Sequence, residues 1–98
     1  MEKQKPHCRL SVIQCLVKAG EVRVTQAAMI GATELGLELA DMITVVMTLT
    51  TNDFYKSMTT HANHTVWQDV YRTKTKAGDV YLKLTVIEDV LIVSFKEL

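Results

Sequence analysis

The chain has 98 residues, of which 48% are hydrophobic and 22% are charged, and its 11 basic and 11 acidic side chains cancel to a formal net charge of zero. This length and composition fit one globular domain, residues 1–98, and give no support to a disordered chain or to nucleic-acid binding through overall charge. The charge is unevenly spread, since residues 54–83 carry five basic and two acidic side chains, so a local basic patch can exist on a neutral protein.

The first half of the chain predicts helices. Apolar residues recur at helical spacing over residues 6–18, and Pro6 suits a first helical turn. A short edge strand is expected over residues 21–24. Thr25 is a suitable N-cap for a second helix that runs to about residue 35, and Asp41 for a third that runs to about residue 49.

The second half predicts strands. Alternating or β-rich segments cover residues 54–59, 65–72, 79–87 and 90–96, and the connections are a turn at 61–64, a loop at 73–78 and a two-residue turn at 88–89. Closely spaced strands favour an antiparallel meander. Helices followed by strands indicate an α+β fold, with the N-terminal helices packed on one face of a mostly antiparallel sheet.

Strand alternation separates a core face from a polar face. The expected core face contains Val80, Leu82, Leu84, Val86, Leu91, Val93 and Phe95. A two-residue hairpin loop would pair Ile87 with Val90, Thr85 with Ile92, Lys83 with Ser94, and Tyr81 with Lys96. Arg72 is hard to bury without a partner, so the other face is expected to expose Lys56, Met58, Gln68, Arg72, Tyr81, Lys83 and Lys96.

Alternation alone leaves two interpretations of this polar face. It can be a solvated surface whose lysines discourage aggregation. It can also be a site for RNA cleavage, in which the 2′-hydroxyl attacks the neighbouring phosphorus. Such a site needs a base, cations and an acid. Lysine and arginine can stabilise the developing charge, tyrosine can transfer a proton, and glutamine can bind a base edge.

Other motifs are few. His61 and His64 lie in a predicted loop without cysteine or carboxylate partners at metal-binding spacing, so we expect solvated or substrate-contacting residues and no metal site. Cys8 and Cys15 lie seven residues apart in a predicted helix, which favours buried free thiols in a reducing cytoplasm. The N-terminal residues lack the apolar run of a signal peptide and no segment is long and apolar enough for a membrane span, so we expect neither. No P-loop, serine-hydrolase motif or dinucleotide fingerprint occurs in these residues.

Long segments of the chain resemble the MqsR toxin family. They are residues 53–60 (DFYKSMTT), 64–72 (HTVWQDVYR), 80–87 (VYLKLTVI) and 89–96 (DVLIVSFK), with shorter matches at 6–10 and 34–37. The resemblance covers essentially the whole chain without gaps. The departures lie in the loops at 61–63 and 73–77 and in a lower basic charge, which is where sequence preference and partner choice could differ.

The resemblance implies a RelE-like fold and a type II toxin. The activity it implies is a ribosome-independent endoribonuclease of the cytoplasm, an mRNA interferase that cleaves single-stranded mRNA near GCU sequences without a metal or other cofactor. It also implies a cognate MqsA-like antitoxin with a zinc domain and a DNA-binding domain. DNA would then be bound only indirectly, through the antitoxin.

The resemblance also implies a set of site residues. The family's catalytic residues fall on Lys56, Gln68 and Tyr81, and its supporting RNA-binding residues fall on Tyr55, Met58, Arg72 and Lys96. This set agrees with the polar face derived from alternation, except that Tyr55 would point to the other side.

We expect Lys56 and Tyr81 to transfer protons or stabilise charge, Arg72 and Lys96 to hold phosphate, and Gln68 to position the RNA. The alternative is a catalytically inactive RelE-like module that binds a partner and acts in transcriptional regulation, because a fold does not establish an activity.

Overall fold

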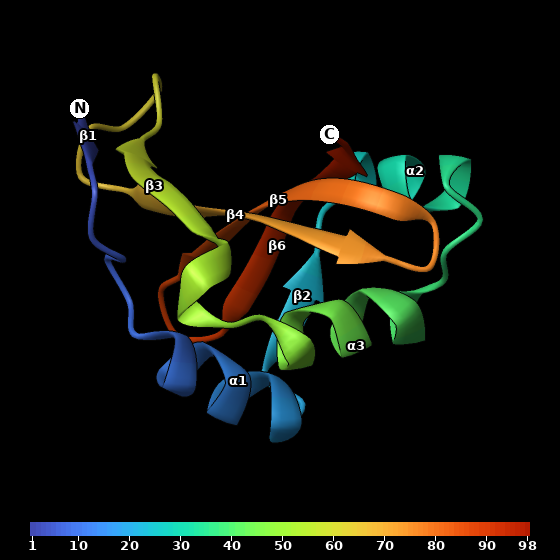
Figure 1. Cartoon of the computed structure of the whole chain (residues 1–98). Coiled ribbons are helices and arrows are strands. Elements are labelled where there is room, and N and C mark those ends of the chain that lie inside the picture. The colour runs from blue at the N-terminus through green and yellow to red at the C-terminus, as the bar shows by residue number, and fades with distance from the viewer.

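The computed structural model describes residues 1–98 and has the expected α+β fold (Figure 1). One sheet of six strands has the order β1-β3-β4-β5-β6-β2 and is antiparallel except for β2, which runs parallel to β6. The strands are β1 (Glu2–Lys3), β2 (Val22–Val24), β3 (Phe54–Thr59), β4 (Trp67–Thr75), β5 (Gly78–Val86) and β6 (Val90–Glu97). The helices are α1 (Leu10–Lys18), α2 (Gln26–Glu34), α3 (Leu39–Thr48) and the 3₁₀ turn η1 (Thr51–Asp53).

The core lies between the helices and one face of the sheet. In Figure 1, α1 and α3 lie beneath the sheet, and α2 packs against β6. The core includes Ile13, Ala28, Ala32, Met42, Val46, Tyr71, Val80, Leu82, Ile92 and Phe95, each fully or almost fully buried. None of the helices is long and apolar enough to cross a membrane.

The predicted start of the first helix is wrong. The helix begins at Leu10 and not near Pro6. The preceding segment is held open because the backbone N–H groups of His7 and Cys8 donate to the Asp69 carboxylate, at 2.9 and 3.0 Å, and therefore do not enter a helix. Cys8 is half-buried in this segment and Cys15 is exposed on α1, so the expectation of two buried thiols is also wrong for Cys15.

The predicted N-cap of α2 is confirmed, whereas the predicted N-cap of α3 is wrong. Thr25 is the N-cap of α2, as predicted, and its Oγ1 accepts a 3.1 Å hydrogen bond from the N–H of Ala28. Asp41 is not the N-cap of α3. Glu38 is, and Asp41 sits three residues later, where its carboxylate accepts the N–H of Glu38 and closes a capping box.

The hairpin between β5 and β6 combines right and wrong predictions. Lys83 faces Ser94 and Tyr81 faces Lys96, as predicted. The loop, however, has three residues, 87–89, and Val86 faces Val90. A bulge at Val93 restores the register, so the core residues of β6 are Val90, Ile92 and Phe95, and not Leu91 and Val93. Similarly, the predicted loop at 73–78 is shorter, since β4 continues to Thr75, which pairs with Gly78.

Candidate functional site

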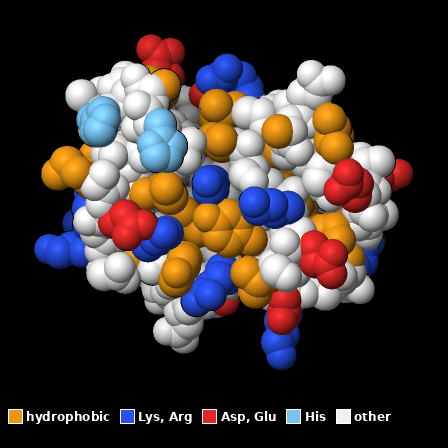
Figure 2. Space-filling model, turned by 90° about the horizontal axis from the view of Figure 1, so that it is seen from above, with side chains coloured by type: hydrophobic (Ala, Val, Ile, Leu, Met, Phe, Trp, Pro, Cys, Tyr) orange, Lys and Arg blue, Asp and Glu red, His pale blue; other side chains and the backbone are white.

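The sheet face opposite the helices carries the side chains predicted to form the site. Residues paired directly across strands point to the same side of a sheet. One row crosses β4, β5 and β6 and consists of Arg72, Tyr81 and Lys96. A second row consists of Lys56, Val70, Lys83 and Ser94, and Met58 pairs with Gln68 beside it. Figure 2 shows basic side chains gathered around hydrophobic ones on this face.

Tyr55 also contributes to this face, contrary to the prediction from alternation. The pairing of β3 with β4 shifts between Phe54 and Lys56, which makes Tyr55 the extra residue of a β-bulge. The Phe54 ring therefore packs edge-on against Tyr71, with centroids 5.5 Å apart, whereas the Tyr55 ring lies 3.9 Å from the guanidinium carbon of Arg72.

Each of the two tyrosines on this face has two cationic neighbours. Arg72 and Lys56 lie next to Tyr55, with Lys56 Nζ 5.4 Å from the ring centroid. Lys96 and Lys83 lie next to Tyr81, with their Nζ atoms 5.4 and 5.8 Å from its centroid. Such contacts contribute about 0.5–1 kcal/mol each at exposed positions. More importantly, they place four positive charges around two aromatic rings, which suits a phosphate next to a base.

Lys56 is held by a residue that sequence patterns did not reveal. The short strand β1 pairs with β3 so that Glu2 faces Met58, and the Glu2 carboxylate accepts a hydrogen bond from Lys56 Nζ. This hydrogen bond raises the pKa of Lys56 above its ordinary value of 10.5 and lowers the pKa of Glu2 below 4.5. Lys56 is thus held in its protonated, cationic form.

Lys83 has a different environment from Lys56. It makes no ion pair with a carboxylate, and its pKa is lowered by partial burial and by the nearby charges of Lys96 and Lys56. Its neighbour in the row, Val70, is fully buried although it is not part of the core between sheet and helices. Long side chains on the polar face therefore shield part of that face from water.

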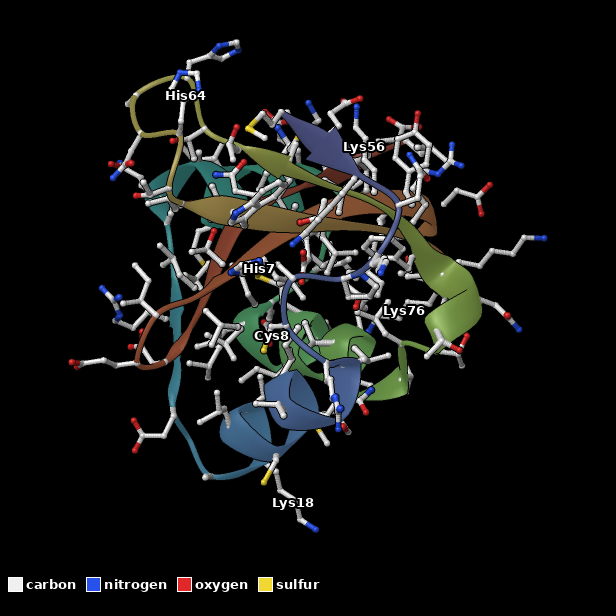
Figure 3. All side chains as sticks on the ribbon, turned by 90° about the vertical axis from the view of Figure 1, so that its left-hand side faces the viewer. His7, Cys8, Lys18, Lys56, His64 and Lys76 are labelled. Atoms are coloured by element: carbon white, nitrogen blue, oxygen red, sulfur yellow. The ribbon has the colours of Figure 1, made fainter.

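The N-terminal segment covers Trp67, which lies on the same side of β4 as Asp69 and Tyr71, opposite the polar face. The His7 ring stacks on Trp67 with centroids 5.5 Å apart and an interplanar angle of 16°, and Lys3 Nζ lies 4.1 Å from the Trp67 centroid. His61 and His64 are exposed in the loop between β3 and β4, away from this stack. In Figure 3, Lys56 and His64 lie on the side of the sheet opposite α1, and His64 points outward from its loop.

A depression of about 470 Å³ adjoins one end of the polar face. It is lined by Asp53, Arg72, Thr73, Lys74, Asp79 and Leu98. Arg72 is the only one of these that belongs to the seven predicted site residues. The depression contains both charge signs, so it could bind a base edge and a phosphate together. No group of three or more His, Cys, Asp or Glu side chains with metal-binding geometry occurs in the chain.

Comparison with known proteins identifies the class to which this fold and this face belong. Residues 5–97 match the family model described as "Motility quorum-sensing regulator, toxin of MqsA". The chain is also 59% identical over 97 residues to the "mRNA interferase toxin MqsR" of Escherichia coli (strain K12), which covers 99% of both chains. The chain therefore belongs to the MqsR toxin family.

The structure brings all seven predicted site residues to one face. Lys56, Gln68, Tyr81, Met58, Arg72 and Lys96 arrive there through strand alternation, and Tyr55 through the bulge. Two further residues contact the set. Lys83 could be placed on the face by alternation. Glu2 could not, because a two-residue strand has no recognisable pattern and its partner lies 54 residues away.

Proposed function

We propose that this chain is the toxin of a toxin–antitoxin pair and that it cleaves single-stranded mRNA as an endoribonuclease. The observation that carries the proposal is the cationic face built around Lys56, Tyr81 and Arg72, in a chain 59% identical to a protein named as an mRNA interferase toxin. The family's catalytic positions and the cations next to the tyrosines coincide on this face.

The proposed chemistry uses the RNA as its own nucleophile. The 2′-oxygen attacks the adjacent phosphorus, negative charge grows on the phosphate oxygens, and the 5′-oxygen leaves. Arg72, Lys96 and the protonated Lys56 are placed to stabilise that charge. The Tyr81 hydroxyl donates a proton to the leaving 5′-oxygen. Gln68 hydrogen-bonds a base or ribose edge.

Tyr55 and Met58 are assigned to RNA binding in this proposal. The exposed ring of Tyr55 offers a stacking surface on one side while Arg72 contacts the other, and Met58 lies beside Gln68. Trp67 is not assigned to stacking, because it lies on the opposite side of the sheet, where His7 and Lys3 cover it.

We further propose that cleavage occurs near GCU sequences, independently of the ribosome and of metal ions, in the cytoplasm. An MqsA-like antitoxin neutralises the toxin, and DNA is bound only through that antitoxin. These details rest on the family membership and on the near-complete match of the chain to its E. coli relative.

The test is cleavage of a GCU-containing single-stranded RNA by the purified protein in excess EDTA. Lys56→Ala and Tyr81→Phe should abolish or strongly reduce cutting while the fold is retained by circular dichroism. The matched control is Lys18→Ala, since Lys18 is exposed at the end of α1 and lies far from Lys56 in Figure 3. If folded wild-type protein cuts neither this RNA nor varied sequences, the chain is instead a non-catalytic partner-binding module.

A further inference from the structure

The proposed reaction lacks one component, a base for the 2′-hydroxyl. Lysine, arginine and tyrosine side chains are ordinarily protonated at neutral pH, and glutamine and methionine do not titrate. The seven residues assigned to the site include only these types. RNA cleavage of this kind, on which the inference rests, requires a group that can take up the proton.

Glu2 is the carboxylate in contact with the site. Of the 11 acidic residues, it alone makes a hydrogen bond or ion pair with one of the seven, namely with Lys56. Its pairing opposite Met58 places it on the polar face of the sheet. By contrast, Asp69 is buried on the other side of the sheet, where its oxygens accept from Ser57, His7 and Cys8.

The geometry of Glu2 leaves it free to act on a substrate. Lys56 binds Oε1, whereas Oε2 makes no hydrogen bond within the chain, and the side chain is 53% exposed. Lys56 therefore orients the Glu2 carboxylate and leaves Oε2 able to accept a proton from a substrate. The other charged groups facing it are the ammonium of the preceding residue, Met1, and, beyond Lys56, the cations Lys83 on β5 and Lys96 on β6.

We propose that Glu2 is the general base of the cleavage reaction. Glu2 takes the proton from the 2′-hydroxyl as the 2′-oxygen bonds to phosphorus. The bond from phosphorus to the 5′-oxygen breaks, and that oxygen takes a proton from Tyr81. The products are a 2′,3′-cyclic phosphate and a 5′-hydroxyl, and exchange with water returns Glu2 and Tyr81 to their starting forms.

Lys56 lies between the proposed base and the proposed acid. Glu2 is level with Gln68, whereas Tyr81 is level with Arg72, four residues farther along β4, so the two side chains approach the site from opposite directions. Lys56 Nζ donates to Glu2, and Tyr81 is near enough to contribute to the raised pKa of Lys56. Because Lys56 lowers the pKa of Glu2, the carboxylate stays ionised and ready to accept a proton at neutral pH.

The test compares Glu2→Gln with wild type in single-turnover cleavage across acidic to mildly alkaline pH, using protein with an unmodified N-terminus. The amide oxygen of glutamine still accepts from Lys56 but cannot take up a proton. We expect the cleavage rate of Glu2→Gln to fall by about 10²- to 10⁴-fold while RNA binding is unchanged. The wild-type rate should decrease at acidic pH as Glu2 becomes protonated, and this acidic limb of the pH profile should be absent in Glu2→Gln. Glu2→Asp should recover part of the rate, and Glu34→Gln, an exposed carboxylate on α2, should match wild type.

A second substrate separates base from acid. An RNA whose 5′-bridging oxygen is replaced by sulfur needs no acid to release its leaving group. It should therefore restore cutting by Tyr81→Phe but leave Glu2→Gln impaired.

Wild-type cutting by Glu2→Gln, retention of its acidic limb, or its rescue by the sulfur substrate would overturn the assignment. A rate that instead follows a group titrating at alkaline pH would also exclude Glu2 as the base. If wild type itself cuts no RNA, the proposed function fails and not this assignment alone.

Discussion

Asp69 and Ser57 face each other across β4 and β3, and the Ser57 hydroxyl donates a 2.6 Å hydrogen bond to Asp69 Oδ1. Both side chains are almost completely buried on the side of the sheet opposite Lys56. The same carboxylate accepts the backbone N–H groups of His7 and Cys8. One buried aspartate thus fixes the N-terminal segment, which carries Glu2, to the strands that carry Lys56 and Gln68.

Asp69→Asn should destabilise the protein. Asparagine offers one acceptor oxygen in place of two and turns an amide N–H₂ toward a backbone donor. We expect the free energy of unfolding to fall by about 1–3 kcal/mol, measured by urea denaturation. Amide exchange of His7 and Cys8 should also become faster. The control is Asp79→Asn, an exposed side chain on β5, and equal midpoints for the two variants would contradict the prediction.

Lys56 and Glu2 should stay ion-paired over a wide pH range. The pKa of Glu2 is lowered by Lys56, so its contribution to stability is present above pH 4.5 and is lost as the pH falls through its folded-state pKa. The pKa of Lys56 is raised by Glu2, so its contribution is present below pH 10.5 and is lost as the pH rises through its folded-state pKa. NMR titration of Lys56 should show a lower midpoint in Glu2→Gln, and an unmoved midpoint would rule out the pairing in solution.

Arg72→Gln should weaken RNA binding and make it less dependent on salt. If Arg72 contacts one phosphate, the slope of log affinity against log salt should fall by about 0.7 for a single strand. Binding is measured with an RNA that lacks the attacking 2′-hydroxyl and so stays intact. Arg72→Lys should keep the slope and lose part of the affinity, because an ammonium cannot stack on Tyr55 as a planar guanidinium does. An unchanged slope in the glutamine variant would exclude the phosphate contact.

Gly31→Ala should separate α2 from the sheet. A Cβ at this position would lie 1.9 Å from the Phe95 carbonyl oxygen, which belongs to the backbone of β6 and cannot turn away. The helix must shift, at a cost of about 1–3 kcal/mol, although alanine is the better helix former. Thermal unfolding measures the loss. Gly20→Ala meets no atom within 4 Å and tests backbone strain alone, at φ +82°. A Gly31→Ala variant as stable as wild type would mean that α2 packs less closely than described.

Most of the fold could be predicted from periodicity and capping residues. The order of elements, the α+β class and the Thr25 cap follow from patterns within a few residues of each other. The errors arose where a distant partner decides the local structure. Residues 6–9 have the pattern of a helix start, but the N–H groups of His7 and Cys8 donate instead to Asp69, more than 60 residues away. Asp41 is equally suitable at the N-cap and at the third position, so composition could not separate the two.

The candidate site was predictable to the extent that strands alternate regularly. Alternation placed Lys56, Gln68 and Tyr81 together, and it failed at Tyr55 because a bulge inserts one residue that no local pattern marks. Glu2 illustrates a different limit. A two-residue strand is stabilised by its neighbour and not by its own composition, so its place at the sheet edge becomes known only with the three-dimensional fold.

The bulge at Val93 has a consequence for how this chain can change in length. Compared with a two-residue loop at 88–89, the three-residue loop at 87–89 shifts the pairing of β5 with β6 by one residue. The extra residue in β6, Val93, reverses this shift before Ser94. Deleting Val93 alone would remove the bulge and leave Leu84 opposite Ile92 and Lys83 opposite Ser94, so both halves of the hairpin would keep their faces. Relatives that lack one residue in β6 should therefore lack it at the position of Val93, without a matching change in the loop at 87–89.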